Sequence, residues 1–192
     1  LSAKSGDQIL DVGCGIGVDV VAIANIYPEI CTVVGVDKSG DMVHEARRRT
    51  PAELLVSKKV QYYIGSLQNL KIKDEIFASV RSDRTFQYLE DPAEGLGELM
   101  RIVKPDGSIV ISEPDWNSLG ISGLSNESAE TIRDTFLSII PNPAMGHDLF
   151  MLFSNQLLND VEEIKMPLYF YGAEHVEGIL LLKRSMSRAV VS

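Results

Sequence analysis

The sequence predicts an α/β protein, a doubly wound and mostly parallel sheet with helices on both faces. Short apolar segments alternate with segments of helical periodicity along the first 112 residues. This alternation is typical of parallel sheets whose strands are connected by helices. The chain has 192 residues, of which 45% are hydrophobic and 23% charged. It is therefore long enough to bury a core, and its composition is that of an ordinary globular protein.

Five strands are expected in this first part. Gln8–Val12 is a short apolar segment that ends in a glycine-rich turn, as a buried parallel strand does. The other expected strands are Thr32–Val36, Val60–Ile64, Ile76–Val80 and Ser108–Ser112. Before the fifth strand, residues 104–107 (Lys-Pro-Asp-Gly) predict a turn, because proline presets φ and glycine tolerates positive φ.

The expected helices begin and end at recognisable residues. Val18–Tyr27 has helical periodicity and stops before Pro28. Asp91 is expected to cap a helix that begins at Pro92, with proline at the first helical position. The other expected helices are Asp41–Arg49, Ser125–Ile139 and Gly146–Leu158. A sixth strand is expected within Val161–Tyr171, and residues 174–191 are expected to form a helix or a strand.

Composition and charge exclude several classes of function. The net charge of −9 disfavours general binding to phosphate backbones. The two cysteines and three histidines show no metal-ligand spacing, so no metal is expected. No apolar stretch approaches the ~20 residues of a membrane span. No signal peptide is recognisable at the front. We therefore expect a protein of the reducing cytoplasm.

The most informative segment is residues 11–17, Asp-Val-Gly-Cys-Gly-Ile-Gly. A strand runs into glycines at every second position and then into a helix; such glycines allow a tight turn and close approach of a ligand to the backbone. Asp37 closes the second strand, where a carboxylate can accept hydrogen bonds from two ribose hydroxyls. The dinucleotide fingerprint would place its third glycine at position 18, which is Val18. If the ligand is an adenosyl sulfonium instead, it has no phosphate to neutralise, and the loop only has to make room for its amino-acid half.

These residues carry a family resemblance. Residues 11–17 resemble motif I of the class I S-adenosylmethionine-dependent methyltransferases, and residues 34–42 resemble their second motif. Residues 86–92 and 99–107 resemble later segments of the branch that includes ubiquinone/menaquinone-biosynthesis C-methyltransferases. The resemblance implies a Rossmann-like class I methyltransferase fold. It also implies S-adenosyl-L-methionine as the cofactor and S-adenosyl-L-homocysteine as its product.

The length of 192 residues predicts one domain, and the resemblance, which runs from about Ser5 to Trp116, implies how it is organised. We expect a single domain over 1–192, with a cofactor-binding core over 1–116 and acceptor-side helices and last strands over 117–192. Only seven residues precede the first expected strand. We therefore expect the chain as given to lack the family's N-terminal helical lid. It would also lack the last strand if residues 174–191 form the helix that precedes it.

The resemblance assigns roles to cofactor-binding residues. Gly13 and Gly15 would contact the methionine part, with Asp11 near its ammonium, and Asp37 would bind the ribose. Met42 would pack on the adenine. The other residues expected to bind the cofactor are Gly17, Lys38, Ser66, Leu67 and Arg81, the last just past the fourth strand. Two of these roles have ordinary alternatives, core packing for Met42 and a loop-bracing hydrogen bond for Asp11.

Methyl transfer from a sulfonium is an in-line displacement in which holding the reactants in line supplies much of the acceleration. A base is needed only if the acceptor must lose a proton. Candidates for catalysis are Glu113, Asp115, Tyr88 and His147, and each has a plain structural alternative in a turn or at a helix end. Trp116 is expected either to line an acceptor pocket or to anchor its loop, and Cys14 to pack.

We therefore expect a methyltransferase that acts on a small-molecule acceptor and does not bind nucleic acid. Two alternatives remain. A non-catalytic adenosyl-binding module is consistent with Ser66, which stands where the family usually has an aspartate, and with the short N-terminus. A nicotinamide-dependent oxidoreductase is disfavoured by Val18 and by the lack of a clear Tyr-x-x-x-Lys. Tyr88 stands where many relatives carry histidine, and the sequence leaves both the acceptor and the oligomeric state open.

Overall fold

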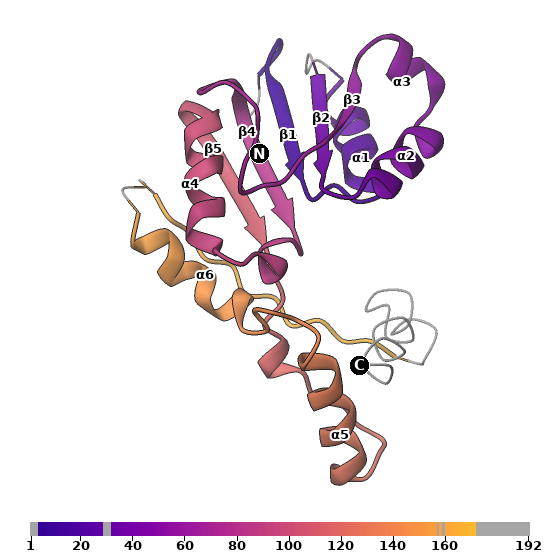
Figure 1. Cartoon of the computed structure of the whole chain (residues 1–192), viewed down its shortest axis with the longest axis vertical. Coiled ribbons are helices and arrows are strands. Elements are labelled where there is room, and N and C mark those ends of the chain that lie inside the picture. The colour runs from indigo at the N-terminus through magenta and orange to yellow at the C-terminus, as the bar shows by residue number, and fades with distance from the viewer. Residues whose placement is uncertain (1–3, 29–31, 157, 159, 172–192) are drawn as a thin grey trace. The chain divides into compact units, whose positions relative to one another are not determined.

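The computed structural model describes residues 4–28, 32–156, 158 and 160–171. The chain divides into two compact units, Leu1–Glu113 and Pro114–Ser192, which are described separately. The first unit contains the five-stranded sheet, and the described residues of the second contain two α-helices (Figure 1).

All pairings in the sheet of the first unit are parallel, in the order β3-β2-β1-β4-β5. The strands are β1 (Gln8–Val12), β2 (Thr32–Asp37), β3 (Val60–Ile64), β4 (Phe77–Asp83) and β5 (Val103–Ser112). From β1 the chain adds β2 and then β3 on one side of the sheet, and it then adds β4 and β5 on the other side. In such sheets ligands bind at the carboxyl ends of the strands where the order reverses, here between β1 and β4. The doubly wound parallel fold expected from the sequence is confirmed.

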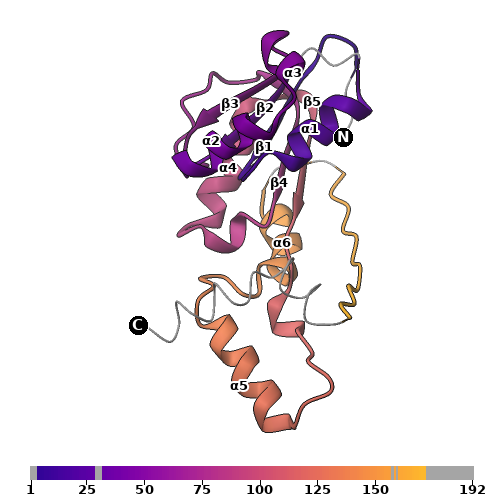
Figure 2. The ribbon, with the colours of Figure 1, turned by 90° about the vertical axis from the view of Figure 1, so that its right-hand side faces the viewer.

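Helices connect these strands. They are α1 (Val18–Ile26), α2 (Gly40–Arg49), α3 (Ala52–Val56) and α4 (Pro92–Ile102), with a short 3₁₀ helix η1 (Phe86–Tyr88) after β4. Right-handed crossovers that leave the centre of a sheet in opposite directions place their helices on opposite faces. By this rule α1 and α2 cover one face and α4 the other. Figure 2 shows α2 next to β3, its main strand partner. Neither α3 nor η1 is expected from the sequence.

The core lies on both faces of the central strands. Ile9, Leu10, Val33 and Val80 are 0% exposed, as expected for parallel strands covered on two sides. On α4 itself, Leu96, Leu99 and Ile102 are 0% exposed. This packing gives the loops at the carboxyl edge of the sheet a rigid base.

Strands β4 and β5 differ from the expectation in two ways. First, β4 continues to Asp83 rather than ending at Val80, so Arg81 lies inside the strand. Second, the expected turn over residues 104–107 falls inside β5. There the partner of β4 changes from residue 103 at Phe77 to residue 108 at Ser79, so the intervening residues bulge out.

The glycine of this bulge serves a purpose different from the expected one. The positive φ, 62°, belongs to Asp106 and not to Gly107. A Cβ on Gly107 would lie 2.6 Å from Val103 Cγ2 and 2.8 Å from the Lys104 carbonyl oxygen. Glycine is therefore required here because the backbone passes close to its neighbours.

The second unit contains a 3₁₀ helix η2 (Trp116–Ser118), α5 (Asn126–Leu137) and α6 (Met145–Ser154). Both expected helices are present with shorter bounds. The prediction of a sixth strand within Val161–Tyr171 is wrong, because residues 160–171 form no strand. The apolar side chains of this segment are largely exposed, for example Leu168 at 70%. The backbone of residues 160–171 forms no ladder with any described strand. The helix or strand expected over 174–191 lies outside the described residues.

Candidate cofactor site

The loop of residues 13–17 joins β1 to α1 at the point where the strand order reverses. Gly13, Gly15 and Gly17 have φ of 74°, 52° and 78°, values that cost other L-residues ~1–2 kcal/mol each. The backbone N–H groups of Gly13 and Cys14 donate to the Val36 carbonyl at 2.8 and 3.1 Å. The loop is therefore fastened to β2 as well as to β1.

The three glycines differ in what surrounds them. A Cβ on Gly13 would collide with the Thr85 side chain, and one on Gly17 would collide with the Tyr62 hydroxyl. A Cβ on Gly15 would meet no atom within 4 Å. Gly13 and Gly17 are therefore required for packing, whereas Gly15 leaves open space beside the backbone, where a ligand can approach.

Asp37 lies at the carboxyl end of β2 and is bonded to this loop. Its Oδ2 accepts the Gly15 N–H at 2.9 Å, and its Oδ1 accepts the Ser39 N–H at 2.8 Å. Each carboxylate oxygen has a second acceptor position, so two donors can still bind. Both oxygens are held in place by backbone groups, which prepares the carboxylate for a ligand with two adjacent hydroxyls.

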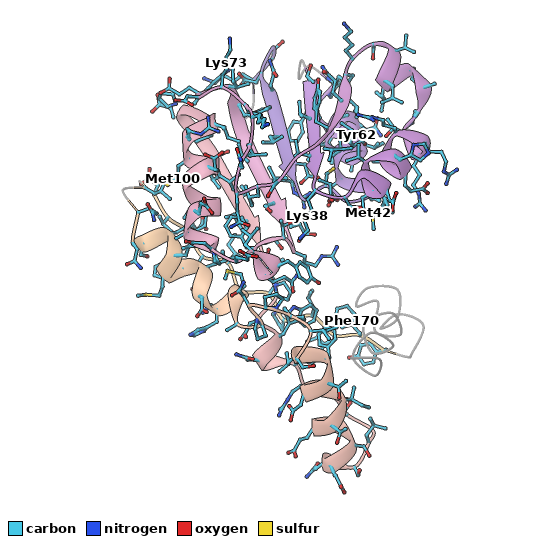
Figure 3. All side chains as sticks on the ribbon, viewed as in Figure 1. Lys38, Met42, Tyr62, Lys73, Met100 and Phe170 are labelled. Carbon is cyan, nitrogen blue, oxygen red and sulfur yellow. The ribbon has the colours of Figure 1, made fainter. Side chains whose placement is uncertain are left out.

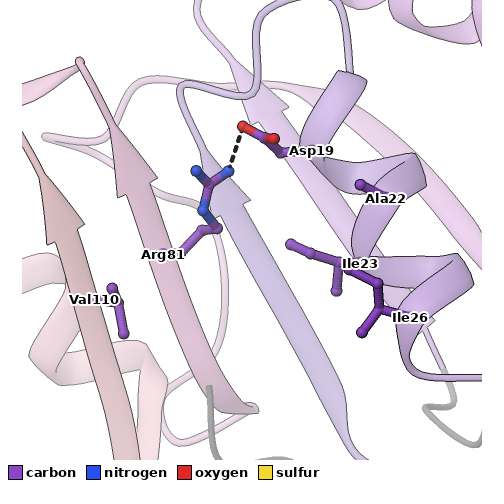
Figure 4. Close-up of a pocket in the computed structure, with 6 residues that line it drawn as sticks. All are labelled: Asp19, Ala22, Ile23, Ile26, Arg81 and Val110. Atoms are coloured by element: carbon purple, nitrogen blue, oxygen red, sulfur yellow. Dashed lines mark hydrogen bonds and ion pairs between the residues drawn. The ribbon is translucent and has the colours of Figure 1, made fainter. Parts of the chain in front are cut away.

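The buried Asp11 and the partly exposed Arg81 form an ion pair across β1 and β4. Arg81 Nη1 lies 3.1 Å from Asp11 Oδ1 and 2.8 Å from Asp19 Oδ2 on α1. Burial raises the pKa of Asp11 to about 7, although the charge of Arg81 opposes the shift. Figure 4 shows Arg81 reaching toward α1, at one end of a cavity of about 240 Å³ that Ile23 and Val110 also line. The sequence does not reveal the role of Asp19, because no local signal links residues 62 positions apart.

The residues expected at the adenine fall into two groups. Lys38 and Ser66 are exposed, and Met42 is 40% exposed, so Met42 is not a core residue. Lys38 and Met42 lie close together where β2 passes into α2 (Figure 3). Leu67 is 3% exposed and packs under α4, where a Cβ on Gly95 would be 3.6 Å from its Cδ2. The structure thus gathers Lys38 and Met42 beside Asp37 and leaves Leu67 in the core.

Glu113 fastens η1 to the end of β5. Its Oε1 accepts the backbone N–H groups of Thr85 and Phe86, both at 2.6 Å. Its Oε2 is buried and has no hydrogen-bond partner in the described part of the chain. Burial raises the pKa of Glu113 to about 7. Burial also raises the pKa of the half-exposed Tyr88, helped by the nearby charge of Glu113, so Tyr88 keeps its proton at neutral pH.

The other two candidates for catalysis belong to the second unit. Asp115 caps η2, with Oδ1 accepting the Asn117 N–H at 3.1 Å. Trp116 packs edge-to-face on Phe136 with ring centroids 4.9 Å apart, an anchoring contact. His147 is exposed in the first turn of α6.

Two side chains beside the glycine loop are absent from the sequence-based site. Thr85 lies against Gly13, and Tyr62 lies against Gly17. They come from segments far along the chain, and only the sheet register brings them to the loop. Cys14 is buried, and burial raises the pKa of its thiol to about 12, which fits the packing role expected for it.

No helix among the described residues is long and apolar enough to cross a membrane.

Comparison with known proteins identifies the family. A family model described as a methyltransferase domain matches residues 3–164. An uncharacterized 37.1 kDa protein in transposon TN4556 of Streptomyces fradiae is 34% identical over 99% of this chain and 54% of its own length. The ubiquinone/menaquinone biosynthesis C-methyltransferase UbiE of Geotalea daltonii is 28% identical over 55% of this chain and 45% of its own. The chain thus spans about half the length of these relatives.

Solved structures agree with this result. Phosphoethanolamine N-methyltransferase 2 of Haemonchus contortus, in complex with S-adenosyl-L-methionine, is 26% identical with a TM-score of 0.54. The match covers 69% of this chain and 30% of that one. The methyltransferase fold and family expected from the sequence are confirmed, and S-adenosylmethionine is confirmed as the cofactor at the level of the family.

Proposed function

The chain belongs to the methyltransferase domain family, and we propose that it transfers a methyl group from S-adenosylmethionine to a small-molecule acceptor. One observation carries the proposal. The Asp37 carboxylate is held by the N–H groups of Gly15 and Ser39 at the carboxyl edge of the sheet, beside a loop backbone open to a ligand.

The residues at this edge fit the cofactor. Gly15 would let the methionine part approach the backbone, because its position offers open space. Asp37 would accept the two ribose hydroxyls, and Met42 with Lys38 would flank the adenine. Ser66 is exposed and offers a neutral hydroxyl to the adenine amino group. Asp11 would act mainly through its ion pair with Arg81, since it is 2% exposed.

The bound cofactor supplies a methyl group already attached to a good leaving group, so the protein's main task is to hold the acceptor in line. Tyr88 is half exposed after β4 and protonated at neutral pH, as the raised pKa of its hydroxyl indicates. We assign it the role of hydrogen-bond donor to the acceptor. Glu113 would position η1 through its bonds to Thr85 and Phe86. Asp115 and His147 remain candidates on the second unit.

The experiment is a calorimetric titration with S-adenosylmethionine and S-adenosylhomocysteine. Asp37→Asn should weaken binding of both by about 10- to 100-fold, since a hydrogen bond to a charged group contributes roughly 1.5–3 kcal/mol. Asp41→Asn is the matched control, because Asp41 is an exposed carboxylate in the first turn of α2. It should bind as the parent does.

The outcomes separate the hypotheses. No binding by the folded parent chain would refute the proposal, and so would equal losses in the two variants. Tight binding without turnover over a broad panel of acceptors would instead favour an adenosyl-binding module. Tighter binding of a nicotinamide cofactor would favour an oxidoreductase.

We place the protein in the cytoplasm, where a free thiol such as that of Cys14 stays reduced.

A further inference from the structure

Tyr62 lies against Gly17, the last residue of the glycine loop. It belongs to β3 and is 3% exposed (Figure 3). A Cβ on Gly35 would lie 2.6 Å from its Cδ1, and a Cβ on Gly17 would collide with its hydroxyl. The ring therefore occupies the space that glycines at these two positions leave between β2 and the start of α1.

The hydroxyl of Tyr62 is held by the end of α2. Thr50 Oγ1 donates to the Ala46 carbonyl at 2.8 Å, which uses its single proton. In the 2.9 Å contact between Tyr62 and Thr50 the Tyr62 hydroxyl is then the donor, and it shares its single proton with the Gly17 carbonyl, the second acceptor within reach. The Arg47 guanidinium also donates to the backbone carbonyl of Tyr62, so α2 fixes both ends of this residue.

The Tyr62 hydroxyl also contacts the loop directly. It lies 3.4 Å from the carbonyl oxygen of Gly17, the residue that caps α1 with φ of 78°. The Gly17 N–H closes the loop on the Cys14 carbonyl at 2.9 Å, and the Gly17 carbonyl accepts the Val21 N–H at 3.1 Å. One side chain from β3 thus supports the last residue of the loop and the first bond of the following helix.

We propose that Tyr62 is a positioning residue that keeps the glycine loop in its ligand-binding conformation. The inference rests on the proposed function, since it concerns the loop that would hold the cofactor. Tyr62 touches no ligand-facing surface, so it acts through Gly17. Without its hydroxyl the loop spends less time in the binding conformation, and the apparent affinity falls with the population of that conformation.

Tyr62→Phe removes the hydroxyl and keeps the ring. We expect the affinity for S-adenosylmethionine to fall roughly three- to tenfold, the equivalent of one lost hydrogen bond. In the ligand-free protein, amide hydrogen exchange at Gly17 and Val21 should become faster while exchange in β1 is unchanged. Thr50→Val removes the competing acceptor and leaves the Tyr62 proton to the Gly17 carbonyl alone, so the affinity should be at least that of the parent and exchange at Gly17 and Val21 should not become faster.

Two controls separate positioning from general destabilisation. Tyr63→Phe removes an exposed hydroxyl from the same strand, one bonded to Gln61, and should leave affinity and exchange unchanged. Ile102→Val weakens the core under α4, where Ile102 is 0% exposed. It should lower the urea midpoint without changing the affinity.

Each outcome has one meaning. If Tyr62→Phe lowers the affinity no more than Ile102→Val and leaves exchange at Gly17 unchanged, the positioning role is refuted. If Tyr62→Phe does not fold, Thr50→Val decides: unchanged or slower exchange at Gly17 supports the positioning role, and faster exchange with weaker binding refutes it. A parent chain that binds no S-adenosylmethionine refutes the proposed function instead, and the exchange rates of the free protein still test the support of the loop.

Discussion

At the scale of the residue, the three glycines of the loop show how similar backbone angles serve different purposes. All have positive φ, yet a Cβ on Gly13 would strike Thr85, whereas Gly15 faces open space. Gly15→Ala should therefore cost only the ~1–2 kcal/mol of a left-handed residue. It should nevertheless weaken S-adenosylmethionine binding at least tenfold if the cofactor occupies that space. Urea unfolding and calorimetry on the same sample measure the two effects.

Gly13→Ala provides the contrast. The new methyl group would add a collision with Thr85 to the same backbone cost, so we expect a loss of stability larger by ~1–3 kcal/mol, as in other overpacked sites. If Gly15→Ala were the more destabilising of the two, the space beside Gly15 would not be open. If Gly15→Ala bound the cofactor like the parent, the ligand would not approach the loop there.

At the scale of the element, α4 begins at a well-defined cap. The Asp91 carboxylate accepts the N–H groups of Ala93 and Glu94 at 2.9 and 3.0 Å, and Pro92 is the first helical residue. Asp91→Ala should cost ~1 kcal/mol of unfolding free energy. Glu90→Ala, at the exposed preceding position, should cost much less. Equal urea midpoints for the two variants would show that the cap does not stabilise the helix.

Elements with local signals are also those that the sequence predicts best. The start of α4 follows from Asp91 and Pro92, and the end of β1 follows from the glycines. The end of β4 could not be placed, because it depends on pairing with β5 up to Ser112. The prediction of a strand within Val161–Tyr171 was wrong for the same reason, because alternating apolar residues do not by themselves provide a partner strand.

The candidate site divides in the same way. Asp37 and the three glycines follow from spacing along the chain, because strand, loop and helix succeed one another there. Tyr62, Thr85 and Asp19 do not, because their contacts with the loop or with Arg81 exist only after the sheet sets its register. The supporting residues of a site are therefore harder to predict than those that face its ligand.

At the scale of the whole molecule, two carboxyls among the described residues, the buried Asp11 and the largely buried Glu113, make stability depend on pH near neutrality. Burial raises the pKa of Asp11 and of Glu113 to about 7, from ordinary values of 3.8 and 4.5. Between the ordinary pKa values and pH 7, the folded protein binds more protons at these two carboxyls than the unfolded chain does. The unfolding free energy therefore falls as pH rises through this range. Glu45, whose pKa is lowered to about 2 by its bonds to Arg48 and Arg49, has the opposite effect but only below pH 4.5.

Urea midpoints measured from pH 5 to 8 should therefore fall with rising pH and level off above about 7. Glu113→Gln keeps an acceptor oxygen for Thr85 and Phe86 and removes the buried charge. Its midpoint should fall less with pH, and at pH 8 it should exceed that of the parent by the equivalent of roughly 1–3 kcal/mol, since each pKa unit is worth about 1.4 kcal/mol. The remaining slope belongs to Asp11. A parallel decline in both proteins would mean that Glu113 is ionised in the folded state well below neutral pH, and that charge on this carboxyl does not oppose folding.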